Sequence, residues 1–221
     1  MRTEAAAAAE SVGESTVVET LAVRAVALQR RAEARVVVGV TGPPGCGKST
    51  LAVLVAARIG DDAAVVPMDG FHLRNDDLTQ LGRRDQKGAA NTFDVDGFIE
   101  LLHRLRVHPT QPVTFPEFDR IRDEPVRAAG EVAPDVSIVI VEGNYLLTQE
   151  HLWNEARPLF DEVWYIDLDH AERLRRLVTR HRQFGMTLEE ASTWANGPDE
   201  ANAVLIERTR STADLLVALE P

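Results

Sequence analysis

The sequence contains little cysteine, little lysine and no long apolar run. The single cysteine, Cys46, excludes an internal disulfide and is typical of a reducing compartment. The sequence has no run of 18 apolar residues and no cationic segment followed by an apolar one, so we expect neither a membrane span nor a signal peptide. These absences predict a cytoplasmic protein that does not contact membranes.

Positive charge is also scarce, because 24 lysines and arginines face 35 acidic residues and leave a net charge of −11. Nothing in the sequence indicates a continuous basic face, which argues against a general nucleic-acid-binding protein. Lys48 and Lys87 are the only lysines, and arginine is used elsewhere. The length of 221 residues and the hydrophobic content of 44% are typical of one sizeable globular α/β domain.

The segment from Arg35 to Leu54 joins an apolar β-branched run, a glycine-rich turn and apolar residues at helical spacing. The turn, GPPGCGKS, matches the pattern G-x-x-x-x-G-K-[ST]. Its glycines let successive N–H groups point into one anion-sized hollow, and the helix start adds the positive end of a dipole. We therefore predict that the chain binds a nucleoside triphosphate. The predicted nucleotide-binding residues are Gly42, Gly45, Cys46, Gly47, Lys48, Ser49 and Thr50.

Within this loop, Lys48 is predicted to reach the β- and γ-phosphates and to act in catalysis. The Ser49 hydroxyl is predicted to ligate Mg²⁺. The alternative is a glycine-rich turn that binds nothing, but the flanking strand and helix patterns favour the phosphate loop.

Five apolar runs near residues 36, 64, 137, 163 and 214 alternate with segments of helical periodicity. This alternation predicts a three-layer α/β/α fold with a parallel five-stranded sheet. Helices are also expected at residues 15–34, 94–106, 148–156, 170–182, 188–194 and 200–208. A short extended segment at 113–120 is expected to lead into a polar turn through Pro125. We predict a disordered tail at 1–13 and a single domain at 14–221, with a substrate loop at 72–93 and a lid region at 170–197.

Two acidic residues directly follow predicted strands. In an open parallel sheet, ligands gather beyond the carboxyl ends of the strands. Asp69 is therefore a candidate catalytic residue, although Asp-Gly is also an ordinary turn. Glu142 follows the apolar run 136–141 at a Walker B position and is a candidate Mg²⁺ ligand. The alternative for Glu142 is a strand-terminal acid without a ligand.

The predicted helix 170–182 is rich in arginine, and Arg173, Arg176 and Arg180 share one face. A run of charge is normally a solvated face. Because this stripe follows a strand end on the phosphate-loop side of the sheet, we interpret it as a lid whose arginines bind phosphate. The basic residues of the long loop favour an acceptor that already carries a carboxylate or phosphate, unless they merely close over ATP. They are Arg83, Arg84 and Lys87.

Together these motifs resemble the uridine kinase and type I pantothenate kinase group of P-loop small-molecule kinases. The resemblance is greatest to bacterial proteins labelled nucleoside/nucleotide kinase-like or fructose-transport-system kinase. It covers roughly residues 34–218. Its motifs are the phosphate loop, Met68-Asp-Gly-Phe71, Lys87-Gly-Ala…Thr92-Phe-Asp94, Ile140-Val-Glu-Gly143 and the arginine-rich helix. It implies a sheet in the order 2-3-1-4-5, transfer of the γ-phosphoryl group of Mg·ATP to a hydroxyl of a small metabolite, and a homodimer.

The same resemblance implies roles for individual residues. Asp69 matches the aspartate that takes the proton from the acceptor hydroxyl, and Glu142 matches the acid that helps to hold Mg²⁺. Arg180 looks like the lid arginine that touches the ATP phosphates, with Arg176 as a second candidate. The predicted acceptor-binding residues are Asp69, Phe71, Arg83, Arg84, Lys87, Phe118, Arg120, Glu142, Tyr145 and Asn202.

The chain also departs from both named branches of this group. It lacks the tyrosine-rich segment and the later histidine of uridine kinases, and Asn202 matches the asparagine-rich helix of pantothenate kinases only loosely. We therefore predict an acceptor that is nucleoside-like, pantothenate-like or sugar-like without choosing among them. The alternative function is a nucleotide-binding regulatory protein or ATPase. The sequence has no Asn-Lys-x-Asp motif for guanine, and Glu142-Gly143 lacks the paired acids of AAA motors.

Overall fold

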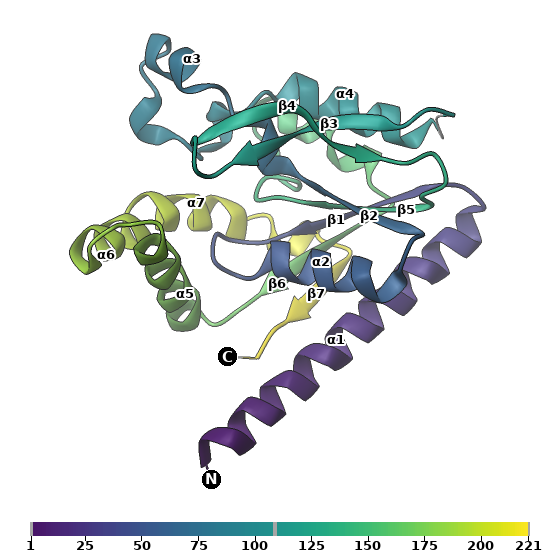
Figure 1. Ribbon diagram of the computed structural model, residues 1–221, viewed down its shortest axis with the longest axis horizontal. Coiled ribbons are helices and arrows are strands. Elements are labelled where there is room, and N and C mark those ends of the chain that lie inside the picture. Colours follow the sequence, from purple (N-terminus) through teal and green to yellow (C-terminus); the bar gives the residue numbers. More distant parts are fainter. Residues whose placement is uncertain (1, 108–109, 221) are drawn as a thin grey trace.

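The computed structural model describes residues 2–107 and 110–220, with the backbone course alone for residues 2–14 and 151. A parallel five-stranded sheet forms its centre (Figure 1). The strands are β1 (Val36–Thr41), β2 (Ala63–Pro67), β5 (Ile138–Glu142), β6 (Glu162–Asp167) and β7 (Leu215–Ala218). Every residue of β1 and β5 is buried, as expected for parallel strands that are covered on both faces.

The strand order across the sheet is β2-β5-β1-β6-β7. Counted along the chain, these five strands follow the expected order 2-3-1-4-5, and the labels differ only because β3 and β4 form a separate hairpin. β1 pairs with β5 on one side and with β6 on the other. The segments that follow β1, β2 and β5 therefore emerge side by side at one edge of the sheet.

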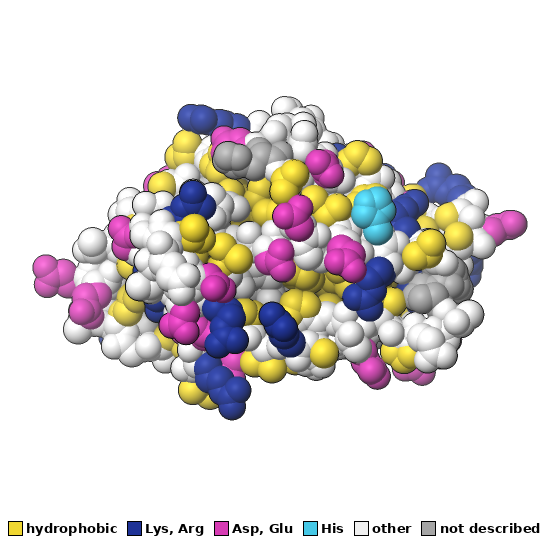
Figure 2. Space-filling view, turned by 90° about the horizontal axis from the view of Figure 1, so that it is seen from above, with side chains coloured by type: hydrophobic (Ala, Val, Ile, Leu, Met, Phe, Trp, Pro, Cys, Tyr) yellow, Lys and Arg dark blue, Asp and Glu magenta, His cyan; other side chains and the backbone are white. Residues whose placement is uncertain are grey.

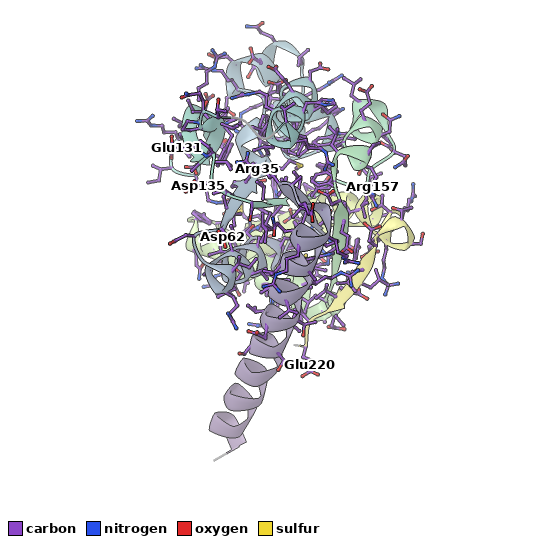
Figure 3. All side chains as sticks on the ribbon, turned by 90° about the vertical axis from the view of Figure 1, so that its right-hand side faces the viewer. Arg35, Asp62, Glu131, Asp135, Arg157 and Glu220 are labelled. Carbon is purple, nitrogen blue, oxygen red and sulfur yellow. The ribbon has the colours of Figure 1, made fainter. Side chains whose placement is uncertain are left out.

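Two helices cover one face of the sheet (Figure 1). They are α1 (Arg2–Ala32) and α2 (Lys48–Ile59), which contribute Leu21 and Leu51 to a core cluster with Trp164 of β6. α1 begins at Arg2, whereas the sequence predicts a disordered tail there. Alanine has the highest helix propensity, so the alanine run continues the helix. This part of α1 projects beyond the body of the molecule (Figure 3).

The other face is covered by α4 (Val95–Arg106) and the segments around it. α4 begins where predicted, because the Asp94 side chain accepts a hydrogen bond from the Gly97 amide. Phe98 of α4 packs edge-on against Phe71 and at a tilt against Trp153. Helices on both faces confirm the predicted three-layer α/β/α architecture.

The long connection after β2 contains more regular structure than the sequence indicates. It starts with a 3₁₀ turn, η1 (Met68–Phe71), and includes the short helix α3 (Asn75–Gln80). Two further 3₁₀ turns, η2 (Arg84–Gln86) and η3 (Ala90–Thr92), precede α4. Each of these elements is only a few residues long, which is too short for an apolar periodicity that would predict it.

An antiparallel hairpin of β3 (Val113–Asp119) and β4 (Glu124–Val132) lies over η1 and α4 (Figure 1). The extended segment of β3 is confirmed, but β4 replaces the predicted polar turn and continues well past Pro125. β4 is mostly half-buried or exposed, so its sequence lacks the apolar alternation that would have indicated a strand.

After β5 the predicted helix at 148–156 is replaced by two 3₁₀ turns, η4 (His151–Glu155) and η5 (Arg157–Leu159). Pro158 has no amide hydrogen to continue a helical hydrogen-bond ladder. The predicted C-terminal helices are confirmed, and they lie together at one side of the sheet in Figure 1. They are α5 (His170–Gln183), α6 (Leu188–Asn196) and α7 (Pro198–Glu207).

Two surface properties bear on possible partners. No helix in the described part of the chain has an apolar stretch long enough to cross a bilayer. On the face drawn in Figure 2, acidic and basic side chains are interspersed and do not gather into one large patch of either sign.

Candidate active site

The phosphate loop connects β1 to α2 and packs against the lid helix α5. Gly45 has a φ of 84°, in the left-handed region that favours glycine. A Cβ at Gly45 would lie 2.7 Å from Cγ of Leu177 and 2.9 Å from the carbonyl oxygen of Arg173. Glycine is therefore required at position 45 both by the turn and by the contact with α5.

Two cations hold the carbonyl groups of this loop. Lys48 is 8% exposed, and its Nζ donates to the carbonyl oxygen of Pro43 at 3.2 Å. Arg173 is buried, donates to the carbonyl oxygen of Pro44 at 3.4 Å, and forms a short ion pair with Glu200 of α7. Arg173 thus contacts the backbone of the loop and is not one of the cations that line the cavity.

Glu142 lies at the end of β5, directly beside the start of α2. The Ser49 side chain hydrogen-bonds to its carboxylate. Burial raises the pKa of Glu142 to about 7, and the negative charge of Asp69 adds to this, while Lys48 and the Ser49 hydrogen bond lower it. The two candidate metal ligands are therefore in contact with each other.

These oxygen donors fit Mg²⁺, which prefers one or two carboxylates completed by phosphate oxygens and water. Among the side chains of residues 15–107, 110–150 and 152–220, no group of three or more His, Cys, Asp or Glu could hold a metal ion.

Asp69 lies in η1, one strand away from Glu142, and forms an ion pair with Arg120 at 3.2 Å. A Cβ at Gly70 would lie only 1.8 Å from the carbonyl oxygen of Pro116 in β3. The hairpin backbone therefore rests directly on η1. This contact brings the distal end of the hairpin, with Phe118 and Arg120, next to Asp69.

One cavity of about 520 Å³ connects the phosphate loop, the strand ends, the hairpin and the lid. Most predicted site residues outside the glycines line it. They are Lys48, Ser49, Asp69, Arg84, Lys87, Phe118, Arg120, Glu142, Arg180 and Asn202. Residues that lie more than 150 positions apart in the sequence therefore line one shared cavity.

Comparisons with known proteins connect this geometry to a family. A "putative uridine kinase" of Schizosaccharomyces pombe is 33% identical over 205 residues, which cover 88% of this chain and 87% of the relative. The crystal structure of a "putative fructose transport system kinase" from Silicibacter sp. TM1040 is 39% identical, with a TM-score of 0.77 and coverage of 87% of this chain and 97% of that one. The chain belongs to the P-loop kinases of the uridine kinase-like group.

Two further matches are named without a kinase activity. The Escherichia coli protein YggC is 33% identical over 190 residues, which cover 84% of the kinase and 78% of YggC. The ATPase family associated with various cellular activities (AAA) matches residues 38–124, less than half of the chain, in a segment that includes the phosphate loop. The prediction of an ATP-dependent small-molecule kinase is confirmed. The homodimer, the cytoplasmic location and the absence of nucleic-acid binding stay predictions.

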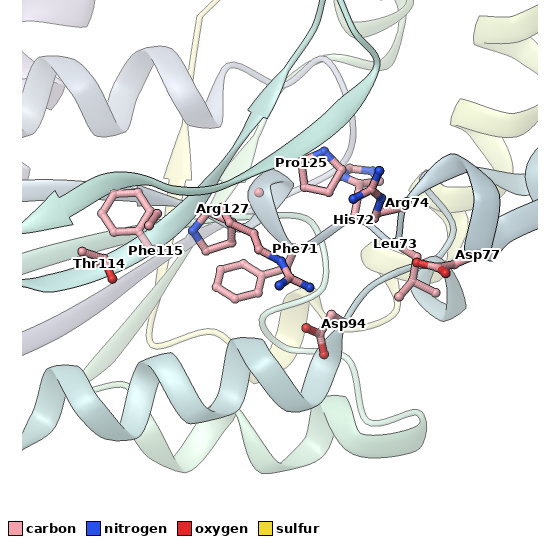
Figure 4. A pocket seen from close by; sticks show the side chains of 13 residues that line it. Phe71, His72, Leu73, Arg74, Asp77, Asp94, Thr114, Phe115, Pro125 and Arg127 are labelled. Carbon is pink, nitrogen blue, oxygen red and sulfur yellow. The ribbon is translucent and has the colours of Figure 1, made fainter.

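Three predicted acceptor-binding residues of the kinase do not line the main cavity. Phe71 lines a separate cavity of about 290 Å³ between the hairpin and the start of α4 (Figure 4). Arg83 turns away and donates to the carbonyl oxygen of Asn91 at 3.1 Å. Tyr145 is buried behind the loop, where its hydroxyl donates to the carbonyl oxygen of Gly88 at 2.6 Å. Sequence position alone did not show which way these side chains point.

Arg176, the second lid candidate, also stands outside the cavity. Its Nε donates to Glu172 at 2.6 Å, and its Nη1 would lie 3.5 Å from a Cβ at Gly47. Arg176 therefore borders the phosphate loop from the α5 side, while Arg180 one turn further faces the cavity.

Several residues that line the cavity were not predicted as site residues from the sequence. The His72 ring lies between Phe93 and Phe118, with ring centroids at 4.1 Å and 4.8 Å. Asp123, at the turn of the hairpin, forms ion pairs with two cations of the loop after α3. His72 directly follows the motif Met68-Asp-Gly-Phe71 and Phe93 lies within the motif that ends at Asp94, but no motif included Asp123, because its hairpin was not predicted.

Proposed function

We propose that this kinase binds Mg·ATP at the phosphate loop and transfers the γ-phosphoryl group to a hydroxyl held at Asp69. The observation that carries the proposal is the single cavity in which Lys48 and Glu142 of the phosphate side face Asp69 and Arg120 of the hairpin side. A phosphoryl donor and an acceptor can therefore meet there without a large rearrangement.

The residues supply positioning and charge, which is most of what phosphoryl transfer requires. The backbone amides of the loop and the Lys48 ammonium would hold the β- and γ-phosphates. The hydroxyl oxygen attacks the γ-phosphorus, the bond to the bridging oxygen breaks, and ADP leaves. Asp69 accepts the hydroxyl proton, and Arg180 offsets negative charge that develops on the transferred group.

Ser49 and Glu142 would hold Mg²⁺ in this arrangement. The ion would supply a fixed positive charge that offsets the negative charge of the phosphates. The hydrogen bond between the two side chains and the burial of Glu142 support the assignment, since a buried carboxylate is costly without a cation.

The test is a comparison of Asp69→Asn with Asp96→Asn, which makes the same change at an exposed position in the first turn of α4. Asp69→Asn should lower kcat with the best acceptor by about 10²- to 10⁴-fold, because general-base catalysis is lost. Nucleotide affinity, measured by calorimetry, should stay within about threefold of the wild-type value in both variants. Near-normal turnover by Asp69→Asn would show that Asp69 is not the base.

A further inference from the structure

The end of the cavity next to the hairpin, which we call the acceptor end, is lined by three cations. Arg84 and Lys87 come from the loop after α3, and Arg120 comes from the hairpin. The Lys87 side chain is only 9% exposed, although lysine is otherwise nearly absent from the sequence. Burial of an ammonium is costly and calls for anionic partners at the same place.

The carboxylates at this end do not balance the cations. Asp69 pairs with Arg120 at 3.2 Å, and Asp123 pairs with both Arg84 and Lys87. Of the other described acids of the lining, Asp199 lies against His181 of α5, and Glu142 lies beside the phosphate loop, where the charges of Asp69 and Arg120 also act on it. Among the carboxylates that line the cavity, only Asp69 and Asp123 form ion pairs with these three cations. Arg120 loses its pair when Asp69 turns toward a substrate hydroxyl.

The ion pairs of Asp123 show that Arg84 and Lys87 can bind one carboxylate together. Its carboxylate lies 2.9 Å from Arg84 and 3.0 Å from Lys87, so the two side chains are spaced to share one acidic group. The Asp123 side chain is 48% exposed, and its backbone has a φ of 53°, which L-residues rarely adopt. An acidic group entering from the cavity can therefore compete for the same cations.

The remaining wall of this end is aromatic. Phe93, His72 and Phe118 form a stack of mutually tilted rings, with interplanar angles of 40° and 47°, and Lys87 Nζ lies 5.0 Å from the centroid of the Phe118 ring. Burial lowers the pKa of His72, so its ring contributes no positive charge at neutral pH. The stack offers a surface for a short carbon skeleton between the base and the cations.

From this arrangement we infer that the acceptor is a small hydroxylated metabolite that carries an acidic group, a carboxylate or a phosphate. Arg84, Lys87 and Arg120 bind the acidic group, and Asp69 receives the hydroxyl. The inference rests on the proposed kinase reaction and specifies its substrate class.

The first experiment measures ADP release from Mg·ATP with matched pairs of acidic and neutral compounds. The pairs are D-glycerate and glycerol, gluconate and glucose, and ribose 5-phosphate and ribose, with uridine as a further neutral probe. We expect at least one acidic member to exceed its neutral partner in kcat/KM by about 100-fold or more. Comparison of D-glycerate and gluconate with ribose 5-phosphate then shows whether the cations prefer a carboxylate or a phosphate.

The outcomes separate the inference from the proposed function. A neutral member or uridine that matches or exceeds every acidic probe in kcat/KM would overturn the inference while leaving the kinase reaction intact. ADP release that no probe accelerates would instead count against both the acceptor class and the proposed reaction.

The second experiment uses Arg84→Gln, with Arg122→Gln as its control. Arg122 is 73% exposed, pairs with Asp119 in the same hairpin turn, and does not line the cavity. Arg84→Gln should raise the KM of the preferred acidic acceptor about tenfold and leave its neutral partner and the KM of ATP within twofold. Lys87→Met should act in the same direction, with circular dichroism to check folding. An unchanged acceptor KM in a folded Arg84→Gln protein would refute the role of this cation.

Discussion

The contact between η1 and the hairpin predicts a large effect of one added methyl group. In Gly70→Ala the new Cβ would lie 1.8 Å from the carbonyl oxygen and 2.5 Å from the carbonyl carbon of Pro116, both backbone atoms. Ordinary contact begins near 3.4 Å, so the two backbones must separate by roughly 1.5 Å. Displacements of about 1 Å at reacting groups cost on the order of 100-fold in rate. Since η1 carries Asp69 and the hairpin carries Arg120, kcat should fall by about 100-fold.

The assay is steady-state phosphorylation of the best acceptor, with nucleotide affinity measured separately by calorimetry. Nucleotide affinity should change little, because the displaced turn η1 follows β2, whereas the phosphate loop follows β1 and packs against α5. Overpacking should also cost about 1–3 kcal/mol of stability. Gly60→Ala controls for that loss, since Gly60 has a φ of 93° but nothing within 4 Å of the added Cβ. A Gly70→Ala enzyme with kcat within threefold of wild type would refute the proposed packing of hairpin on η1.

Two other changes follow from single contacts. Hydrogen bonds from Arg175 and Arg176 lower the pKa of Glu172 from its ordinary 4.5 to about 2. The ionised carboxylate therefore stabilises the fold fully above pH 4.5, and this stabilisation is lost progressively as the pH falls to about 2. Glu172→Gln should therefore cost about 1 kcal/mol in urea unfolding at pH 7 and much less at pH 3, and an equal deficit at both pH values would contradict this reasoning. Tyr145→Phe removes the hydrogen bond to the Gly88 carbonyl and should cost about 1 kcal/mol in thermal unfolding. It should raise the acceptor KM without changing that of ATP, and an altered KM for ATP alone would argue that Tyr145 supports the nucleotide side.

The phosphate loop and the sheet were predictable because their signals are local. The β-branched run before Gly42 and the spacing up to Ser49 specify strand, turn and helix within about 20 residues. The sheet order came from the resemblance, since periodicity identifies strands but not their neighbours. Asp69 and Glu142 were identified by position, because the ends of adjacent parallel strands converge.

The rest of the site depends on contacts that no local pattern encodes. Helical spacing placed three arginines on one face of α5, but only the fold shows that Arg173 is buried against the loop, Arg176 is paired with Glu172, and Arg180 faces the cavity. The hairpin escaped detection because β4 has no apolar alternation. Because the hairpin was not predicted, the pairing of Asp123 with the loop cations could not be predicted either.

The contacts of α5 also constrain how the enzyme can move. The helix is clamped to the phosphate loop through Gly45, and it is tied to the first turn of α7 near both of its ends, through Glu200 and through the pair of His181 with Asp199. We therefore expect α5 to move together with α7 when the lid region opens or closes. On the acceptor side, the ion pairs of Asp123 join the hairpin turn to the loop after α3. We expect the motion during the catalytic cycle to occur mainly at the hairpin turn, where it would control how fast the acceptor enters the cavity.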